Sequence, residues 1–464
     1  MQPFPFFYTA PTGYPEDSAI KNGSLNLYSQ SNPFSYEGLI KIILTANDEY
    51  FLIFTKPFLP DLGKFAIERM VQVASDTGAG LLYVDYTSII DDKRISHPLN
   101  DYQPGSLRDD FDFGPLLLIR TKAAKEALNN LTTHLQAAAL YELRLLIAIN
   151  WPIFHLNESL YTVNENYLPD QEIRQFAYVD PKNRSVQLEM EAVCTRHLKV
   201  INAWLPPVFE KIDLNKGTFP VEASVIIPVK NRCRTIADAI NSVMSQQTCF
   251  PFNLIVIDNH STDGTTDIIA GKARQDNRII HLIPERNDLG IGGCWNEGVQ
   301  HALCGRFAIQ LDSDDVYSDD QTLTKIVEGF YAQQCAMLVG SYRMCNFNLE
   351  TIPPGIIDHK EWTEENGRNN ALRINGLGAP RAFFTPLLRS IKVPNTSYGE
   401  DYALGLRFSR NWKIGRIYDV LYLCRRWEDN SDASADQVKT NAFNHYKDKL
   451  RSIELAARQR MNNK

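Results

Sequence analysis

Short apolar runs, each followed by a segment with helically spaced apolar residues, recur over residues 39–170 and again over 222–425. This alternation is typical of an α/β fold, because strands that are buried on both faces read as continuous apolar runs and the helices between them read as amphipathic segments. Between the two stretches, apolar residues over 186–200 fall at helical spacing, and Pro206 and Pro207 end that segment.

With 464 residues, the chain is longer than most single domains, so we expect two domains and a connector. The pattern predicts an α/β domain at 1–180, a helical connector at 181–220, a second α/β domain at 221–430 and a helical tail at 431–464.

The composition excludes several classes of partner and site. The formal net charge of -7 gives no field that would attract nucleic acid, so we expect no nucleic acid partner. The 8 cysteines are scattered without a C-x-x-C pair, which argues against a zinc site and a disulfide framework and predicts reduced core thiols. The first residues carry no basic region followed by a long apolar stretch, which predicts a cytoplasmic chain.

The tail contains a basic helical segment, "HYKDKLRSIELAARQR", at 445–460. Two interpretations stay open for it: a solvated terminal helix, or a helix that rests on an anionic membrane at its inner face. The sequence leaves the oligomeric state open.

The two halves resemble each other. Residues 141–161 align without a gap on 402–422 with eight identities in 21 positions, and 49–61 match 306–318 in pattern. Two matches in the same order indicate an internal duplication. The acidic residues of the second copy are missing from the first: Asp312, Ser313, Asp314 and Asp315 correspond to Thr55, Lys56, Pro57 and Phe58, and Glu400 and Asp401 correspond to Ala139 and Leu140. This joint loss predicts a non-catalytic first copy. In addition, only about 38 residues precede the first strand of that copy, which are too few for a nucleotide-binding half.

Three carboxylates, Asp312, Asp314 and Asp315, follow the apolar run 307–311 directly. Like charges this close repel one another unless water or a cation compensates them. A solvated turn or helix cap is one interpretation. A calcium loop is not, because its sixth position holds Tyr317 instead of glycine. The remaining interpretation is Mg²⁺ or Mn²⁺ held by one or two carboxylates and a substrate diphosphate.

Two earlier segments add polar turns at strand ends. Residues 225–229 read as a buried strand before a polar turn, and a second strand ends at Asp258 before "NHSTDG". In an open parallel sheet, ligands bind at these carboxyl ends. Glu400 and Asp401 begin an amphipathic helix, where they either complement the helix dipole or supply a general base.

The motifs "VIIPVKNR", "VIDNHSTDGT", "ERNDLGIGGCWNEGV", "LDSDD" and "YGED" occur in the order and spacing of the family 2 nucleotide-sugar glycosyltransferases, which residues 222–430 resemble throughout. The resemblance implies the Rossmann-like glycosyltransferase A fold, and an inverting, hexosyltransferase-type transfer from a nucleotide-diphosphate sugar to a saccharide or lipid-linked saccharide in bacterial-type glycan synthesis. Mn²⁺ or Mg²⁺ is the implied cofactor.

The resemblance also implies residue roles. Pro228, Val229, Lys230, Asn231 and Asp258 would line the base and ribose; Arg286, Asn287 and Gly292 would lie near the donor; Asp312, Ser313 and Asp314 would hold the metal and the sugar diphosphate; Asp401 would be the base, and Glu400 would contact a sugar. Trp362 and Arg381 are candidate acceptor contacts, and Arg426 and Trp427 either close over the donor or pack on the surface.

Three positions depart from the family pattern: Lys230 stands where an aromatic residue is common, Asn259 where a second acid is usual, and Trp427 where many relatives carry a histidine. Nucleotidyl transfer is disfavoured because "PVKNRCR" lacks the glycine-rich phosphate loop. A non-catalytic sugar-nucleotide-binding or scaffold protein of the same fold is the alternative.

Overall fold

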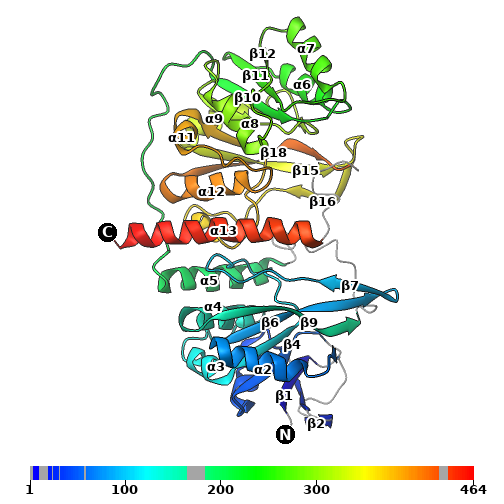
Figure 1. The fold of residues 1–464 in the computed structure, drawn as a ribbon. Coiled ribbons are helices and arrows are strands. Elements are labelled where there is room, and N and C mark those ends of the chain that lie inside the picture. The colour runs from blue at the N-terminus through cyan, green and yellow to red at the C-terminus, as the bar shows by residue number, and fades with distance from the viewer. Residues whose placement is uncertain are drawn as a thin grey trace. The chain divides into compact units, whose positions relative to one another are not determined.

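The computed structural model describes residues 4–9, 19–22, 25–30, 32–56, 59–164, 183–427 and 437–463. The chain forms two compact units (Figure 1). The first comprises Met1–Trp204 and Asp436–Lys464, and the second comprises Leu205–Ala435. Both are α/β units, which confirms the predicted fold class.

The second unit is built on one mixed sheet. In spatial order its strands are β12 (Ile279–Leu282), β11 (Phe252–Asp258), β10 (Ala223–Val229), β13 (Phe307–Gln310), β17 (Arg381–Phe384), β15 (Met337–Cys345), β18 (Ile414–Arg425) and β14 (Val316–Tyr317), with β16 (Thr351–Ile357) paired to β15. Strands β12, β11, β10 and β13 run parallel, and β17 is antiparallel to β13. The carboxyl ends of β10, β11 and β13 therefore meet at one edge of the sheet, as the sequence predicts.

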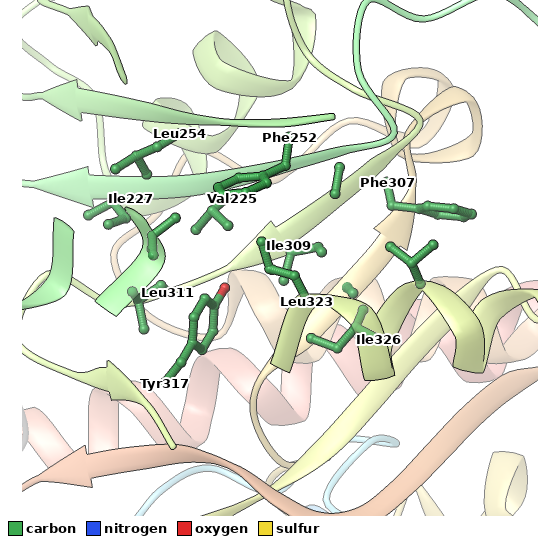
Figure 2. Packing of buried hydrophobic residues seen from close by; sticks show 14 of the residues in the cluster. Val225, Ile227, Phe252, Leu254, Phe307, Ile309, Leu311, Tyr317, Leu323 and Ile326 are labelled. Carbon is green, nitrogen blue, oxygen red and sulfur yellow. The ribbon is translucent and has the colours of Figure 1, made fainter. Parts of the chain in front are cut away.

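Helices cover both faces of this sheet. They are α6 (Ile236–Met244), α7 (Thr265–Gln275), α8 (Ile291–Gln300), α9 (Thr322–Gln333), α10 (Gly367–Asn370), α11 (Thr385–Ile391) and α12 (Glu400–Asn411). The side chains of Val225 and Ile227 lie on one face of the sheet, in the same buried cluster as Leu323 and Ile326 of α9 (Figure 2). Burial of each such side chain contributes roughly 1.5–3 kcal/mol, so this core holds the strand ends in place.

The first unit has its own sheet. In spatial order its strands are β2 (Ala19–Asn22), β3 (Leu25–Gln30), β1 (Phe4–Thr9), β4 (Tyr50–Phe54), β8 (Leu116–Arg120), β6 (Leu81–Ile90), β9 (Ile153–Asn164) and β5 (Asp61–Leu62), with β7 (Lys93–His97) paired to β6. Its helices are α1 (Tyr36–Thr45), α2 (Ala66–Thr77), α3 (Thr121–Leu128), α4 (Ala139–Asn150), α5 (Arg184–Val200) and α13 (Gln437–Asn462). Helix α5 lies within the predicted connector. The bounds of the four predicted segments stay a prediction.

The two sheets share an arrangement. Part of the strand order is the same in both sheets. The first has β4, β8, β6, β9, β5 with β7 paired to β6, and the second has β13, β17, β15, β18, β14 with β16 paired to β15. Each of these pairings has the same direction in both units. We propose on this basis that the first unit is a degenerate copy of the second. Strands β3 and β1 also run parallel beside β4, as β11 and β10 do beside β13. The expectation that too little chain precedes β4 to repeat that half is therefore wrong for its strands.

Helix α13 is not the solvated helix that was one expectation for the tail. Arg451 and Asp448 pair at 2.7 Å with both side chains fully buried, and Asp448 also lies 3.3 Å from Nε of Arg108. Residues 431–436 of the predicted tail lie outside the described residues. Among the residues that the structure does describe, no helix has both the length and the apolar character needed to cross a membrane.

All eight cysteines are free thiols, and five of them are buried. The expectation of core thiols is wrong for Cys249, which is exposed, because it lies in the turn that precedes β11.

Candidate active site

The loops that follow β10 and β11 are tied together at the carboxyl edge of the sheet. Asn231, with a left-handed φ of 53°, accepts a hydrogen bond at Oδ1 from the backbone N–H of Thr262 at 2.8 Å, and its own N–H donates to Ser261 Oγ at 2.9 Å. Asparagine tolerates this backbone conformation. Of the residues predicted to line the base and ribose, Val229 is buried, Pro228 is half-buried, and Lys230 and Asn231 are exposed.

Asp258, the last residue of β11, is fully buried. Its carboxylate accepts hydrogen bonds from the Ser261 N–H at 3.0 Å and Thr266 Oγ1 at 2.5 Å, and lies 3.5 Å from Nε2 of His281. Burial alone would raise the pKa of Asp258, but these hydrogen bonds outweigh it and hold the pKa below its usual value. The carboxylate thus organises the loop after β11 while ionised.

The three aspartates after β13 have different surroundings. Asp312 accepts a hydrogen bond at Oδ1 from Nε2 of Gln310 at 2.9 Å, and its N–H donates to the hydroxyl of Tyr422 at 3.1 Å. Asp315 is buried, and its Oδ1 accepts from the N–H of Arg425 at 2.7 Å. Asp315 is therefore bound within the protein, whereas Asp312 is partly exposed.

Asp314 lies beneath a cationic and aromatic cover. Its Oδ2 is 3.3 Å from Nε1 of Trp427, which donates to it, and 3.8 Å from Nε of Arg232. Burial, followed by the charge of Asp312, raises the pKa of the Asp314 carboxyl. Burial, followed by the charges of Asp314 and Asp312, raises the pKa of Asp315 well above its usual value. The crowding that the sequence implies is therefore present, and the protein's own donors relieve it only in part.

A divalent cation fits this charge pattern. Asp312 and Asp314 are oxygen ligands of the kind that Mg²⁺ and Mn²⁺ take, and a cation would favour their ionised forms. Ser313 between them is buried. Across the described ranges, no group of three or more His, Cys, Asp or Glu side chains is placed to hold a metal. The two carboxylates would therefore need a diphosphate and water as the other ligands, which is common for Mg²⁺.

Trp427 belongs to a cluster above the acidic turn. The guanidinium of Arg234 lies 5.1 Å from its ring centroid, and the ring of Phe347 meets it edge-on at 5.9 Å. Arg426 beside it is half-buried. Trp427 is thus in contact with Asp314 rather than packed elsewhere on the surface. Residues 428–430, which complete the predicted segment, lie outside the described residues.

Asp401 at the start of α12 is connected to the acidic turn. Nη1 of Arg381 pairs with Oδ2 of Asp401, and Nε of the same side chain donates to Oε1 of Gln310 at 2.8 Å. Since Gln310 also binds Asp312, the two carboxylate clusters lie on one continuous hydrogen-bonded chain. Motif order in the sequence predicts the clusters, but Gln310, Tyr422 and Arg425 were not anticipated; the one signal for Gln310 is a polar residue inside the apolar run "FAIQL".

Glu400 combines a raised carboxyl pKa with a buried oxygen atom that lacks a hydrogen-bond partner among the described residues. Its Oε2 is buried and has no hydrogen-bond partner in the described part of the chain. Burial, followed by the charge of Asp401, raises the pKa of Glu400 to about 8, while Arg381 lowers it. A raised carboxyl pKa beside a second carboxylate is common at catalytic sites.

The residues predicted near the donor differ in their contacts. Arg286 forms a two-pronged ion pair with Asp288, at 2.8 and 2.6 Å, on an exposed loop that also carries exposed Asn287. Gly292 lies in α8, where an added Cβ would come 1.9 Å from the carbonyl oxygen of Pro394. Close packing of α8 therefore accounts for this glycine without a ligand.

Trp362, a predicted acceptor contact, is buried. The guanidinium of Arg416 lies 4.6 Å from its ring centroid, and a Cβ on Gly367 would come 2.5 Å from the same ring. These contacts support the segment that precedes β17.

Residues 224–391 match the sequence model of the family described as glycosyl transferase family 2. This segment forms a family 2 glycosyl transferase domain. The match begins in β10 and ends with α11, so it includes the acidic turn and Arg381, whereas Glu400 and Asp401 lie after it.

Two relatives of the family 2 domain are informative by name. This chain is 33% identical to the putative teichuronic acid biosynthesis glycosyltransferase TuaG of Bacillus subtilis over 121 residues, which cover 26% of this chain and 46% of the relative. It is also 33% identical to the GalNAc(5)-diNAcBac-PP-undecaprenol beta-1,3-glucosyltransferase of Campylobacter jejuni over 92 residues, which cover 20% of this chain and 29% of the relative. The matched segments thus span less than half of either relative.

Among solved structures, S. aureus TarS residues 1–349 in complex with UDP-GlcNAc is 25% identical, covering 46% of this chain and 61% of that one, with a TM-score of 0.39.

Proposed function

We propose that this protein is a metal-dependent, inverting glycosyltransferase that moves a sugar from a nucleotide diphosphate to a hydroxyl acceptor. The observation that carries the proposal is the hydrogen-bonded chain from Asp312 to Asp401, because it joins a candidate cation site to a candidate proton acceptor. The family 2 domain supports the reaction class.

The proposed chemistry is a single displacement. The acceptor hydroxyl oxygen forms a bond to the anomeric carbon of the donor sugar while the bond from that carbon to the diphosphate oxygen breaks. The hydroxyl proton passes to Asp401, and the nucleoside diphosphate leaves with the electron pair. Because attack and departure occur on opposite sides of the carbon, the anomeric configuration inverts.

Asp401 has the capacity for this role. Its Oδ1 accepts the N–H of Tyr402 at 2.7 Å, and its Oδ2 pairs with Arg381. An ionised carboxylate offers about four acceptor positions. The Tyr402 N–H and Arg381 thus orient the two carboxylate oxygens, which suits Asp401 to accept a proton from an acceptor hydroxyl. Glu400 beside it is proposed to contact a sugar.

Asp312 and Asp314 are proposed to hold Mn²⁺ or Mg²⁺ together with the donor diphosphate. When bound, the cation supplies positive charge to the departing diphosphate. Arg232 lies 3.8 Å from Asp314 and adds a second cation at the same place. The residues after β10 and β11 are proposed to bind the nucleoside part.

The acceptor is proposed to be a saccharide or a lipid-linked saccharide in polysaccharide synthesis. One relative is named for teichuronic acid biosynthesis, and the name of another contains an undecaprenol-linked saccharide. The cytoplasmic location and a peripheral membrane contact remain predictions.

Release of nucleoside diphosphate from a panel of nucleotide sugars, with Mn²⁺ or Mg²⁺ and a set of saccharide acceptors, tests the proposal. We expect one donor to turn over, a chelator to abolish turnover, and proton NMR of the product to show the opposite anomeric configuration. Asp312→Asn and Asp401→Asn are each expected to reduce kcat by about 100-fold or more. Full activity in both variants would refute the site.

The alternative is a non-catalytic protein of the same fold that binds sugar nucleotides or acts as a scaffold. Calorimetry separates the two: binding of a nucleotide sugar without turnover under any metal or acceptor condition would favour the alternative.

A further inference from the structure

Gln310 and Arg381 form a polar pair across two antiparallel strands. Gln310 is the last residue of β13 and Arg381 is the first of β17, next to the paired residues Ile309 and Ala382. The N–H and Nε of Arg381 both donate to Oε1 of Gln310, at 3.2 and 2.8 Å. The hydroxyl of Tyr317 holds the backbone carbonyl of Gln310 at 2.9 Å.

Each member of the pair reaches one of the two carboxylate clusters. Nε2 of Gln310 donates to Asp312 at 2.9 Å, and Nη1 of Arg381 pairs with Asp401. The Arg381 side chain is only 16% exposed, so solvent does little to loosen it. The guanidinium is planar and rigid, and therefore fixes the distance between its two partners.

The first unit shows what this position of the sheet holds when the carboxylates are absent. Strands β4 and β8 correspond to β13 and β17, and their register places Ile53 opposite Leu117. The alignment of 49–61 on 306–318 sets Ile53 at the position of Gln310, and the strand register sets Leu117 at that of Arg381. Both are buried, at 1% and 4% exposure.

An apolar pair is thus sufficient to build this part of the sheet. Buried polar and charged groups contribute less to stability than well-packed apolar ones of similar volume. The Gln310–Arg381 pair occurs in the copy that carries the carboxylates and is replaced as a pair in the copy that lacks them. Stability alone gives no reason for this difference.

We propose that Gln310 and Arg381 are positioning residues that fix Asp401 relative to Asp312, and hence the proton acceptor relative to the donor diphosphate. This inference rests on the proposed glycosyl transfer. Displacement of a catalytic group by about 1 Å can cost roughly 100-fold in rate, so a rigid link between the two halves of the site has a direct effect on kcat.

Steady-state kinetics of Gln310→Met, Arg381→Met and the double variant test the inference, with the donor identified from the nucleotide-sugar panel. We expect each single change to lower kcat by about 10- to 100-fold while donor KM stays within about threefold. The double variant should lose no more than the larger single loss, because the two residues act as one unit. Arg381→Lys should recover only part of kcat, because an ammonium lacks the planar fork.

Arg306→Met is the matched control. Arg306 pairs with Glu222 at 3.2 Å with a side chain 15% exposed, close to the 16% of Arg381, but it precedes β13 and lies at the other end of that strand. The control should lower the melting temperature about as much as Arg381→Met and leave kcat unchanged. Gln310→Met keeps the Arg381–Asp401 pair, so the test does not depend on one variant folding.

Unchanged kcat in Gln310→Met and Arg381→Met, equal losses in Arg306→Met, or additive losses in the double variant would each overturn the positioning role and leave the proposed function intact. A wild-type chain that turns over no nucleotide sugar would overturn the proposed function, and the positioning role with it.

Discussion

The indole Nε1 of Trp427 lies 3.3 Å from Oδ2 of Asp314 and donates a hydrogen bond to it. This contact brings a residue from the end of β18 onto the acidic turn after β13. Because Asp314 is one of the two proposed cation ligands, the donor from Trp427 competes with, or orients, the oxygen that a metal would bind.

Trp427→Phe is expected to keep the ring packing on Phe347 and remove the N–H donor. The net contribution of a typical hydrogen bond is about 0.5–1.5 kcal/mol, and at 3.3 Å this one is long, so we expect donor KM to change by about two- to tenfold with little loss of stability. Trp412→Phe is the control, since its ring packs on Phe408 at 5.8 Å and not on the acidic turn. Identical kinetics for both variants would rule out a role for the Trp427 donor.

The three aspartates should respond differently to conversion to asparagine. Asp315 is buried and accepts the N–H of Arg425 at 2.7 Å, a bond that asparagine can keep. The raised pKa of Asp315 favours its neutral form, which asparagine matches in charge. We expect Asp315→Asn to retain kcat within about threefold, whereas Asp312→Asn and Asp314→Asn lose about 100-fold or more. Parallel assays with varied Mn²⁺ make the comparison, and a loss in Asp315→Asn that extra Mn²⁺ reverses would make it a ligand.

The sequence predicts the α/β class and the two carboxylate clusters because motif order places them at strand and helix ends, and parallel strand ends meet at one edge. It does not distinguish Asp315 from its neighbours, because the turn geometry decides which carboxylate faces the protein. It also misses the contact of Gln310 with Arg381, since these residues are 71 positions apart and meet only through the antiparallel register of β13 and β17.

The raised pKa of Glu400 predicts that the stability of the metal-free protein depends on pH. Its pKa is raised from 4.5 to about 8 in the folded state. A raised carboxyl pKa favours folding where the group is protonated, so this contribution is complete below about pH 4.5 and is lost as the pH rises through about 8. Glu400→Gln carries no charge at any pH and should therefore melt higher than the wild type at pH 9, by about 3 °C or more.

Calorimetric scans between pH 5 and pH 9 in the presence of a chelator measure this difference. Glu285→Gln, an exposed residue of the same unit, is the control and should follow the wild type at every pH. A gap between Glu400→Gln and the wild type that does not widen with pH would show that burial of the Glu400 charge does not limit stability.

Substitution of Gly292 distinguishes a role in helix packing from a role in donor binding. An added Cβ would come 1.9 Å from the carbonyl oxygen of Pro394, and that oxygen belongs to rigid backbone, so Gly292→Ala should destabilise the second unit by about 1–3 kcal/mol. Gly271→Ala in α7 is the matched control. Its Cβ would meet only a side-chain nitrogen of Arg274 at 4.0 Å, and it should stabilise by about 0.5–1 kcal/mol because alanine favours helix.

Urea unfolding of both variants measures the two effects, and calorimetric titration with nucleoside diphosphate and Mn²⁺ measures ligand affinity. If Gly292 serves packing, Gly292→Ala loses stability and keeps its affinity wherever it remains folded. If the glycine makes room for the donor, stability is retained and affinity falls. The 1.9 Å approach to Pro394 favours the first outcome, because that collision is present before any ligand binds.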